Sequence, residues 1–544
     1  MTDFEFVEFP AYATAPTLES CGELRAVAAP GEMLSIAFGV RAGGTVAELE
    51  LGASSPRSGE IELPPDAVDL KIVKVWAQAG VGVYQSSSTL VPELLLEDDR
   101  VELRDSYSGW CGHWNHLLQR GRYYQPPRVE AIGGGRTALA SGETKQVWLT
   151  VRLAESCVPG VYETVITASD GRATRDLRLR LEVLPIRLLE PSQDLFLWYK
   201  GTLDCRFPQH YVSPRVFEAQ LSDIYAHGFR SISLNEPRAE SRRRALEIAK
   251  RVGFRRNVIL TEPFDEALDP DEYAPLTPVY YLSDELDARG PATVAHHVAN
   301  WREAKKAGAK SMISLINASS ARRFDASGNI GHSPDIFSYY LSANRGHFAS
   351  NDRASTAAYY YWLSHMEKPL VHRALAGVYL WRSGAAGIAP YCYQHLPQFP
   401  NSPFNDFDEW EPGFHVGQER RPFKDHMTTY PSRDGVISTL QWKGLSDGIT
   451  DLKYLTTLDA AISRALASSS LQAREHASNA RARIDAFLDR ISLTDIDVVS
   501  ETNREPYATV AAGEYHAFRL QMARDLVALD ANTEAEAPKA GAHV

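Results

Sequence analysis

Long apolar runs are missing from this sequence. No stretch approaches the ~20 apolar residues that a membrane-spanning helix needs, and the first residues, MTDFEFVEFPAYATAP, are acidic and lack the apolar core of a signal peptide. We therefore expect a cytoplasmic protein that is not inserted in a membrane. A secreted protein whose leader had been removed would begin in the same way.

Basic runs and cysteine pairs are also missing. The net charge is −12 without any long basic segment, which argues against nucleic acid or anionic lipid as the main partner. The five cysteines (Cys21, Cys111, Cys157, Cys205 and Cys392) are odd in number and have no CxxC spacing, which is typical of free thiols in a reducing compartment. No phosphate loop, dinucleotide fingerprint, serine nucleophile elbow or zinc constellation is present. We expect neither a metal nor a cofactor.

The first part of the chain has the pattern of short antiparallel strands. At 544 residues the chain exceeds a single core and should divide into several domains. Residues 1–190 carry short alternating runs separated by Pro, Gly and Asp-Gly turns. The clearest hairpin is ITASDGRATRDLRLRLEV, with Asp170-Gly171 as its turn. We predict an N-terminal β-sandwich over 1–190.

An aromatic insertion at 104–127 interrupts this pattern. It contains Trp110, Trp114, Tyr123 and Tyr124, and two interpretations stay open: a loop packed on itself, or a loop that reaches over a neighbouring pocket. Its two histidines, His113 and His116, have no third ligand at a suitable spacing, so we exclude a metal site there.

Strand and helix patterns alternate after the segment LLEPSQD, which reads as a linker. Eight candidate strands follow: 194–200, 230–236, 257–262, 278–285, 310–317, 336–344, 357–363 and 386–394. Helical patterns lie between them, as at 213–228, where Ser213 is the expected N-cap and Gly228 the stop, and at 292–308. We predict a (β/α)₈ barrel over 191–445. A helical region over 446–530 and a disordered tail over 531–544 should follow.

Acidic residues close several of these strands. Glu236, Glu262 and the pair Asp284-Glu285 recur at intervals of roughly one βα unit. In such a barrel the active site lies at the C-terminal ends of the strands. Most glycosidases cleave the glycosidic bond with a pair of carboxylates. Two neighbours in a regular strand point to opposite faces, so Asp284 and Glu285 can share a pocket only where the strand gives way to its loop.

Three segments together resemble glycoside hydrolase family 123, whose described members are β-N-acetylgalactosaminidases. They are VWLTVRLAESCVPGVYETVITASDG (147–171), YYLSDELD (280–287) and YPSRDGVISTLQWKGLSDGITDLKYLTTL (430–458). The resemblance implies substrate-assisted retention, in which the sugar's own 2-acetamido oxygen attacks the anomeric carbon. Asp284 would orient and polarise that group, and Glu285 would protonate the leaving oxygen. Relatives commonly continue with Pro after the pair, whereas Leu286-Asp287 follows here.

Sugar binding calls for aromatic platforms and polar side chains near the pair. Trp410 is the first candidate, because it lies in the polar segment FNDFDEWEPG, which is not expected to contribute a Trp to the hydrophobic core. The remaining candidates for substrate binding are Tyr340, Tyr393, Trp381, Asn344, Arg345 and Glu236. Core packing is the alternative for each aromatic residue, and a charged rim is the alternative for Glu236 and Glu262. We leave Asp447 and Asp451 out of the site, because acids near a helix start stabilise the helix dipole.

The sequence thus predicts an exo-acting glycosidase for a terminal β-linked N-acetylhexosamine, with N-acetylgalactosamine favoured by the resemblance alone. One alternative is a glycosidase for another sugar, with Glu285 and a separate carboxylate such as Glu236 or Glu262. Retaining pairs lie ~5 Å apart and inverting pairs ~6.5–9.5 Å. The other alternative is a carbohydrate-binding protein without catalysis on the same scaffold. The linkage and assembly into a homo-oligomer stay open.

Overall fold

A computed structural model describes most of the chain. The described residues are 4–78, 89–108, 112–119, 122–123, 134–207, 210–261, 269–324, 333–344, 356–363, 369–394, 427–432, 435–493 and 510–534. Within them no helix is long and apolar enough to cross a membrane.

The N-terminal part consists of two sheets that enclose one core. The first has the order β1 (Phe4–Val7), β3 (Met33–Ala42), β13 (Thr144–Arg152), β7 (Val68–Gln78) and β8 (Thr89–Leu96). The second has the order β12 (Arg136–Leu139), β4 (Val46–Ala53), β14 (Gly160–Ser169), β15 (Thr174–Val183) and β2 (Glu23–Ala28), with β5 (Arg57–Ser58) and β6 (Ile61–Glu62) at its side. Alternate residues of β15 are buried, and they join residues of the first sheet in a single hydrophobic cluster. The predicted antiparallel region is confirmed, with one parallel pair, β2 with β15.

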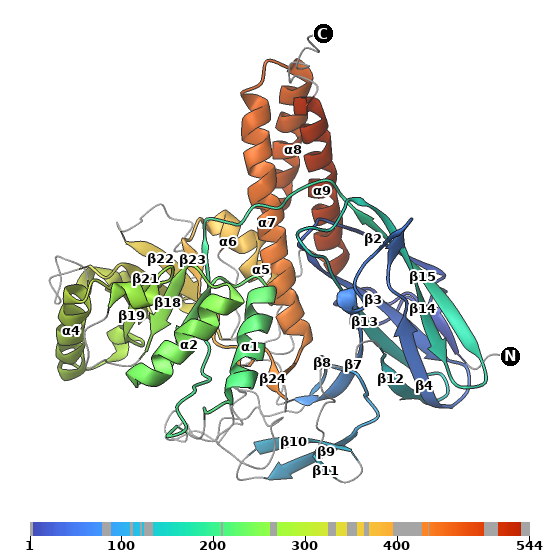
Figure 1. The fold of residues 1–544 in the computed structure, drawn as a ribbon, viewed down its shortest axis with the longest axis horizontal. Coiled ribbons are helices and arrows are strands. Elements are labelled where there is room, and N and C mark those ends of the chain that lie inside the picture. The colour runs from blue at the N-terminus through green and yellow to red at the C-terminus, as the bar shows by residue number, and fades with distance from the viewer. Residues whose placement is uncertain are drawn as a thin grey trace.

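The aromatic insertion forms a small sheet of its own. Strands β9 (Glu102–Ser108), β10 (Gly112–Gln119) and β11 (Arg122–Tyr123) pair antiparallel and lie below β7 and β8 in Figure 1. That this insertion covers a neighbouring pocket stays a prediction.

All eight predicted barrel strands are present, and they close into a parallel barrel. They are β16 (Asp194–Leu197), β17 (Ser231–Leu234), β18 (Asn257–Leu260), β19 (Thr277–Ser283), β20 (Lys310–Leu315), β21 (Ile336–Tyr340), β22 (Ala357–Tyr361) and β23 (Gly387–Ile388). Most residues of these strands are buried, which explains their continuous apolar runs.

The layer of helices around the barrel is uneven. The helices are α1 (Pro214–Ala226), α2 (Ala239–Val252), α3 (Pro270–Tyr273), α4 (Pro291–Lys306), α5 (Pro369–Ala376) and α6 (Val378–Ser383). Helix α1 begins as predicted, since Ser213 Oγ accepts a hydrogen bond from Val216 N, and it is followed by Gly228 at φ +99°. In the described residues between β20 and β21 only a 3₁₀ helix, Ala318–Arg323, takes the place of an α-helix.

Three long helices complete the fold: α7 (Leu440–Leu466), α8 (Leu471–Leu488) and α9 (Ala512–Glu534). They form a column between the barrel and the N-terminal sheets (Figure 1). Helix α7 starts inside the range predicted for the barrel, and α9 continues past residue 530 into the predicted disordered tail. Because α7 packs against α5, β3 and β8, it belongs to more than one unit of the fold.

A buried ionic cluster holds these units together. Arg519 of α9 lies 2.6 Å from Asp451 and 3.4 Å from Glu32 of the N-terminal part, while Arg373 of α5 lies 2.7 Å from Asp451. Asp451 and Asp447 are therefore structural, as expected. The reason differs from the expected one: both lie well beyond the first turn of α7, and Asp451 serves as a counter-ion for two arginines instead of stabilising a helix dipole.

Candidate active site

The chain leaves strand β19 through an unusual turn. The pairing of β19 with β20 shifts between Tyr281 and Ser283, and Glu285 has left-handed backbone angles, φ 47° and ψ 51°. This conformation costs a non-glycine residue roughly 1–2 kcal/mol. Because the regular alternation of the strand ends here, two consecutive carboxylates are no longer bound to opposite faces.

Asp284 is held through one of its two oxygens. Its Oδ1 accepts a hydrogen bond from the Tyr281 hydroxyl at 2.7 Å and one from Ser314 Oγ at 2.9 Å. Asp284 is exposed. An ionised carboxylate only accepts hydrogen bonds, so two hydroxyl donors fit the charged form.

Glu285 has a different environment. Its Oε1 lies 3.3 Å from the Tyr361 hydroxyl, and its backbone N–H donates to Ser314 Oγ at 2.7 Å. Burial, with the negative charge of Asp284 as the second cause, raises the pKa of Glu285 above its ordinary value. Two hydroxyl donors thus favour the ionised form of Asp284, whereas burial favours the protonated form of Glu285. Two carboxylates that differ in this way are suited to act as an anion and as a general acid.

The two tyrosines of this cluster keep their protons. Burial is the main cause that raises the pKa of Tyr281 and of Tyr361 far above the ordinary tyrosine value, and the nearby carboxylates add to it. Both phenols therefore remain hydrogen-bond donors throughout the working pH range of most enzymes.

Aromatic rings surround the pair. The ring of Trp198, which follows β16, meets the Tyr281 ring edge to face at 4.7 Å, and Tyr340 stacks on Tyr361 at 5.3 Å. Trp198 and Tyr340 are only partly buried. Tyr340 was predicted as a site residue, and the structure brings it next to the tyrosine that contacts Glu285.

Four residues of this cluster were not singled out from the sequence: Trp198, Tyr281, Ser314 and Tyr361. Three are aromatic residues near the C-terminal ends of predicted strands, a signal that could have been used. Ser314 is a serine inside a buried strand, and no pattern in the sequence marks it.

Asp287 is the second residue after the pair and follows Leu286. Its carboxylate accepts hydrogen bonds from the backbone N–H groups of Ile316 and Asn317, both at 2.9 Å. Asp287 therefore ties the turn after β19 to the loop after β20.

Two predicted binding residues are engaged in holding loops. Asn344 accepts from Ala318 N and donates to the carbonyls of Ile316 and Tyr340, so its amide clamps the ends of β20 and β21. Glu236 is 0% exposed, and its Oε1 accepts from Leu203 N at 2.7 Å. Burial is the main cause that raises the pKa of Glu236. Neither position is that of a side chain open to a sugar.

Of the predicted aromatic platforms, Tyr393 lies in the core and the partly buried Trp381 packs against it. Tyr393 is fully buried, donates to Asp223 at 2.9 Å and packs edge to face on Trp442. Trp381, on α6, packs against the hydrophobic cluster shared by the barrel helices and α7. Both rings are therefore covered by helices that pack on the barrel. The sequence of the strand ends alone does not show these contacts. Trp410, Arg345 and Glu262 lie outside the described residues.

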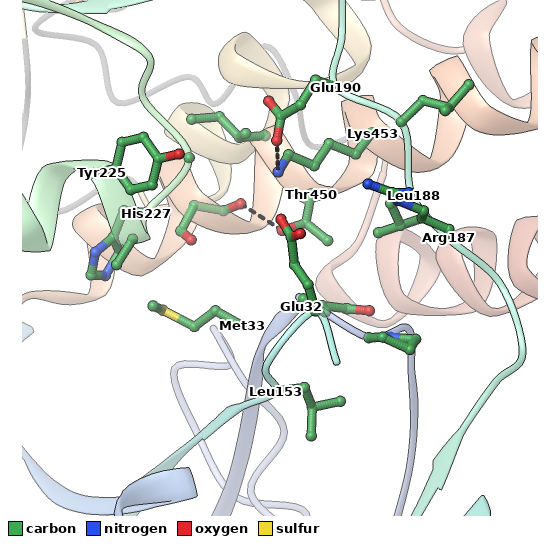
Figure 2. A pocket seen from close by; sticks show the side chains of 18 of the residues that line it. Glu32, Met33, Leu153, Arg187, Leu188, Glu190, Tyr225, His227, Thr450 and Lys453 are labelled. Atoms are coloured by element: carbon green, nitrogen blue, oxygen red, sulfur yellow. Dashed lines mark hydrogen bonds and ion pairs between the residues drawn. The ribbon is translucent and has the colours of Figure 1, made fainter. Parts of the chain in front are cut away.

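A cavity of about 780 Å³ lies elsewhere, between the N-terminal sheets, the linker and helices α1 and α7 (Figure 2). The carboxylate pair does not line it. Several of its charged groups are engaged with protein partners: Lys453 donates to Glu190 at 2.7 Å, and Glu32 accepts from Tyr454 at 2.9 Å. We regard this cavity as part of the seam between units. Among the described residues no cluster of His, Cys, Asp and Glu could hold a metal ion.

The fold and the site define a multidomain protein with a closed parallel barrel and adjacent carboxylates after one of its strands. No protein-family model and no curated protein matches the sequence. Among solved structures, the chain is similar to a family 123 glycoside hydrolase from Clostridium perfringens, with a TM-score of 0.61 and 10% identity over 97% of this chain and 99% of that one. The expected resemblance to this family is thereby confirmed as a shared fold over nearly the whole chain.

Two further structures are much less similar. A β-glucuronidase from Bacteroides uniformis covers 77% of this chain and 66% of its own, with a TM-score of 0.30 and 8% identity. An endo-β-1,4-mannanase from Thermotoga petrophila covers 49% and 77%, with a TM-score of 0.29 and 10% identity. Neither value establishes a shared fold.

Proposed function

We propose that this protein is a retaining glycoside hydrolase that removes a terminal β-linked N-acetylhexosamine, with N-acetylgalactosamine favoured by the family resemblance. The observation that carries the proposal is the contrast within the pair. Asp284 receives two hydroxyl donors, whereas the pKa of Glu285 is raised by burial and by its neighbour's charge. Such a contrast assigns an anion and an acid to two carboxylates of the same site.

In this mechanism the 2-acetamido oxygen of the substrate attacks the anomeric carbon. Glu285 gives its proton to the leaving oxygen as the glycosidic bond breaks. Asp284 accepts the acetamido N–H and stabilises the positive charge that develops on the resulting oxazolinium ring. Glu285, now ionised, takes a proton from water as the water attacks the same carbon, which restores the acetamido group and leaves the configuration retained.

A mechanism with a more distant second carboxylate has less support. Glu236 would have to act as a nucleophile or base, but it is buried and one of its oxygens already accepts a backbone N–H. A protein that only binds carbohydrate would have no need for the strained backbone at Glu285 or for its raised pKa. Strained backbone and perturbed pKa values concentrate at catalytic sites.

The test is hydrolysis of nitrophenyl β-glycosides of N-acetylgalactosamine and N-acetylglucosamine beside their 2-hydroxy counterparts. We expect turnover of the 2-acetamido substrates only, and loss of turnover in the double variant Asp284→Asn/Glu285→Gln. Equal turnover of 2-hydroxy sugars would exclude participation of the acetamido group. An inactive wild-type protein that nevertheless binds the sugars would support the binding-protein alternative.

A further inference from the structure

The pair poses a geometric problem, because residues adjacent in sequence must present both carboxylates to one substrate. One side chain contacts both members. Ser314 of β20 lies 2.9 Å through its Oγ from Asp284 Oδ1 and 2.7 Å from the backbone N of Glu285. We infer that Ser314 is a positioning residue that sets the orientation of the acid and of the anion together. The inference rests on the proposed function, because it assumes that this pair is catalytic.

The donors and acceptors of the Ser314 hydroxyl allow it to bind both members of the pair at once. A serine hydroxyl has one proton and two lone pairs. Ser314 Oγ accepts from Glu285 N, and its own proton is directed at Asp284 Oδ1, toward which the Tyr281 hydroxyl also donates. The two hydroxyl oxygens are themselves 2.7 Å apart, which completes a closed triangle with Oδ1.

This arrangement divides the work between the two oxygens of Asp284. Oδ1 is fixed by Ser314 and Tyr281, while Oδ2 has no protein donor among the described residues. Because Asp284 is exposed, Oδ2 is the oxygen presented to the substrate. The acetamido N–H would therefore meet Oδ2, in an orientation set by the two hydroxyls.

Ser314 is well suited to act as a fixed reference. It is buried on β20, which pairs with β19 on one side and with β21 on the other. It therefore cannot follow a movement of the turn, whereas the exposed turn can adjust to it. Its bond to Glu285 N stabilises the left-handed residue on which the orientation of the acid depends.

Three variants test this inference. Ser314→Ala removes the bonds to the Asp284 carboxylate and to the Glu285 backbone N–H, and Ser314→Thr keeps the hydroxyl with a side chain that suits a strand. Ser311→Ala is the matched control: Ser311 is a buried serine of the same strand whose hydroxyl bonds Asp335 and the Trp301 indole instead of the pair. Each variant is assayed on the glycosides that the wild type hydrolyses, with good and poor leaving groups, and its crystal structure is determined.

We expect Ser314→Ala to lower kcat by about 10²-fold, the effect that a displacement of ~1 Å can have on a reacting group. KM should change little, and the loss should be larger for the poor leaving group, because the acid is misplaced as well as the anion. Ser314→Thr should recover much of the rate, and Ser311→Ala should retain the wild-type kcat. Tyr281→Phe, which leaves the bond to Glu285 N intact, should slow good and poor leaving groups by similar factors.

Wild-type kcat in Ser314→Ala, with both carboxylates unmoved in its crystal structure, would overturn the inference. An equal loss in Ser311→Ala would do the same, because any buried hydroxyl of the strand would then suffice. A wild-type protein inactive on every glycoside would instead refute the proposed function. The variant structure would still decide whether Ser314 orients the pair.

Discussion

The hydroxyl of Tyr361 lies 3.3 Å from Glu285 Oε1. A residue at the end of β22 thus supplies a hydrogen-bond donor to the acid at the end of β19, three strands away around the barrel. This bond favours the ionised form of Glu285 and lowers its pKa, whereas burial and the charge of Asp284 raise it. The net direction is upward. The pKa of Glu285 therefore depends on Asp284 and Tyr361, and each of these two neighbours can be tested by a single substitution.

The first prediction concerns Asp284→Asn and the pH profile. Glu285 must be protonated to act as an acid, so activity is present below its pKa and is lost as the pH rises through it. Removing the negative charge beside Glu285 makes its ionisation easier and lowers that pKa. We expect the alkaline limb of the residual kcat/KM profile to move to lower pH than in the wild type. An unmoved limb would show that another group controls it.

The second prediction is a shift in the opposite direction for Tyr361→Phe. Without the phenol donor the ionised form of Glu285 is less stable, so its pKa rises. The alkaline limb should move to higher pH, as measured by kcat/KM across the pH range. Tyr359→Phe is the control, because Tyr359 is on the same strand but donates to Asp194 at 2.8 Å. Identical profiles for both tyrosine variants would contradict the role of Tyr361.

The third prediction separates the members of the pair by the leaving group. An aryl oxygen of low pKa departs without help, so Glu285→Gln should cripple natural glycosides while partly sparing nitrophenyl glycosides. Asp284→Asn should slow both substrate types by ~10²–10³, the range for loss of one electrostatic stabiliser. Steady-state kinetics on both types measure the difference. The assignment fails for either residue whose variant stays near wild-type activity.

The fourth prediction compares two tryptophans. Trp410→Ala should lower kcat/KM by ~10-fold or more, about 1.4 kcal/mol, if its ring stacks on a sugar face. Trp381→Ala should instead lower the thermal unfolding midpoint and leave the specific activity of the folded protein unchanged, because this ring packs among helices. Loss of stability without loss of specific activity in the Trp410 variant would assign Trp410 to the core as well.

The fifth prediction concerns the buried cluster at the seam. Arg519→Met should lower the free energy of unfolding by about 3–5 kcal/mol, because the carboxylate of Glu32 then remains buried without its cation. Urea denaturation followed by fluorescence measures the change. Arg251→Ala is the control: its pair with Glu218 is exposed, and its loss should barely move the midpoint. A small effect at Arg519 would mean that water or a rearranged partner compensates the charge.

Much of the fold was predictable because its signals are local. Continuous apolar runs marked the eight barrel strands, and Ser213 and Gly228 marked the ends of α1, since burial and capping leave direct traces in composition. The start of α7 at Leu440 was missed, because its first residues are buried by contacts with several units and lack the amphipathic pattern of a surface helix.

Of the candidate site, the sequence indicated only the two acids and Tyr340. Asp284 and Glu285 follow an obvious strand, but their orientation depends on Ser314 and Tyr361, which come from other strands and meet the pair only in three dimensions. The reverse error occurred at Tyr393 and Asn344. Their residue types suggested sugar contacts, but a buried carboxylate and backbone groups already engage them. Such tertiary partners are invisible in a single sequence.

The ion pair between Glu32 and Arg519 joins residues that are 487 positions apart. At ribosomal rates of ~5–20 residues per second, roughly 25–100 s separate the synthesis of the two. During that interval the carboxylate of Glu32 has no contact with Arg519, because α9 has not yet been synthesised. The junction therefore cannot assemble before α9 has been synthesised, whatever order the sheets and the barrel follow before it.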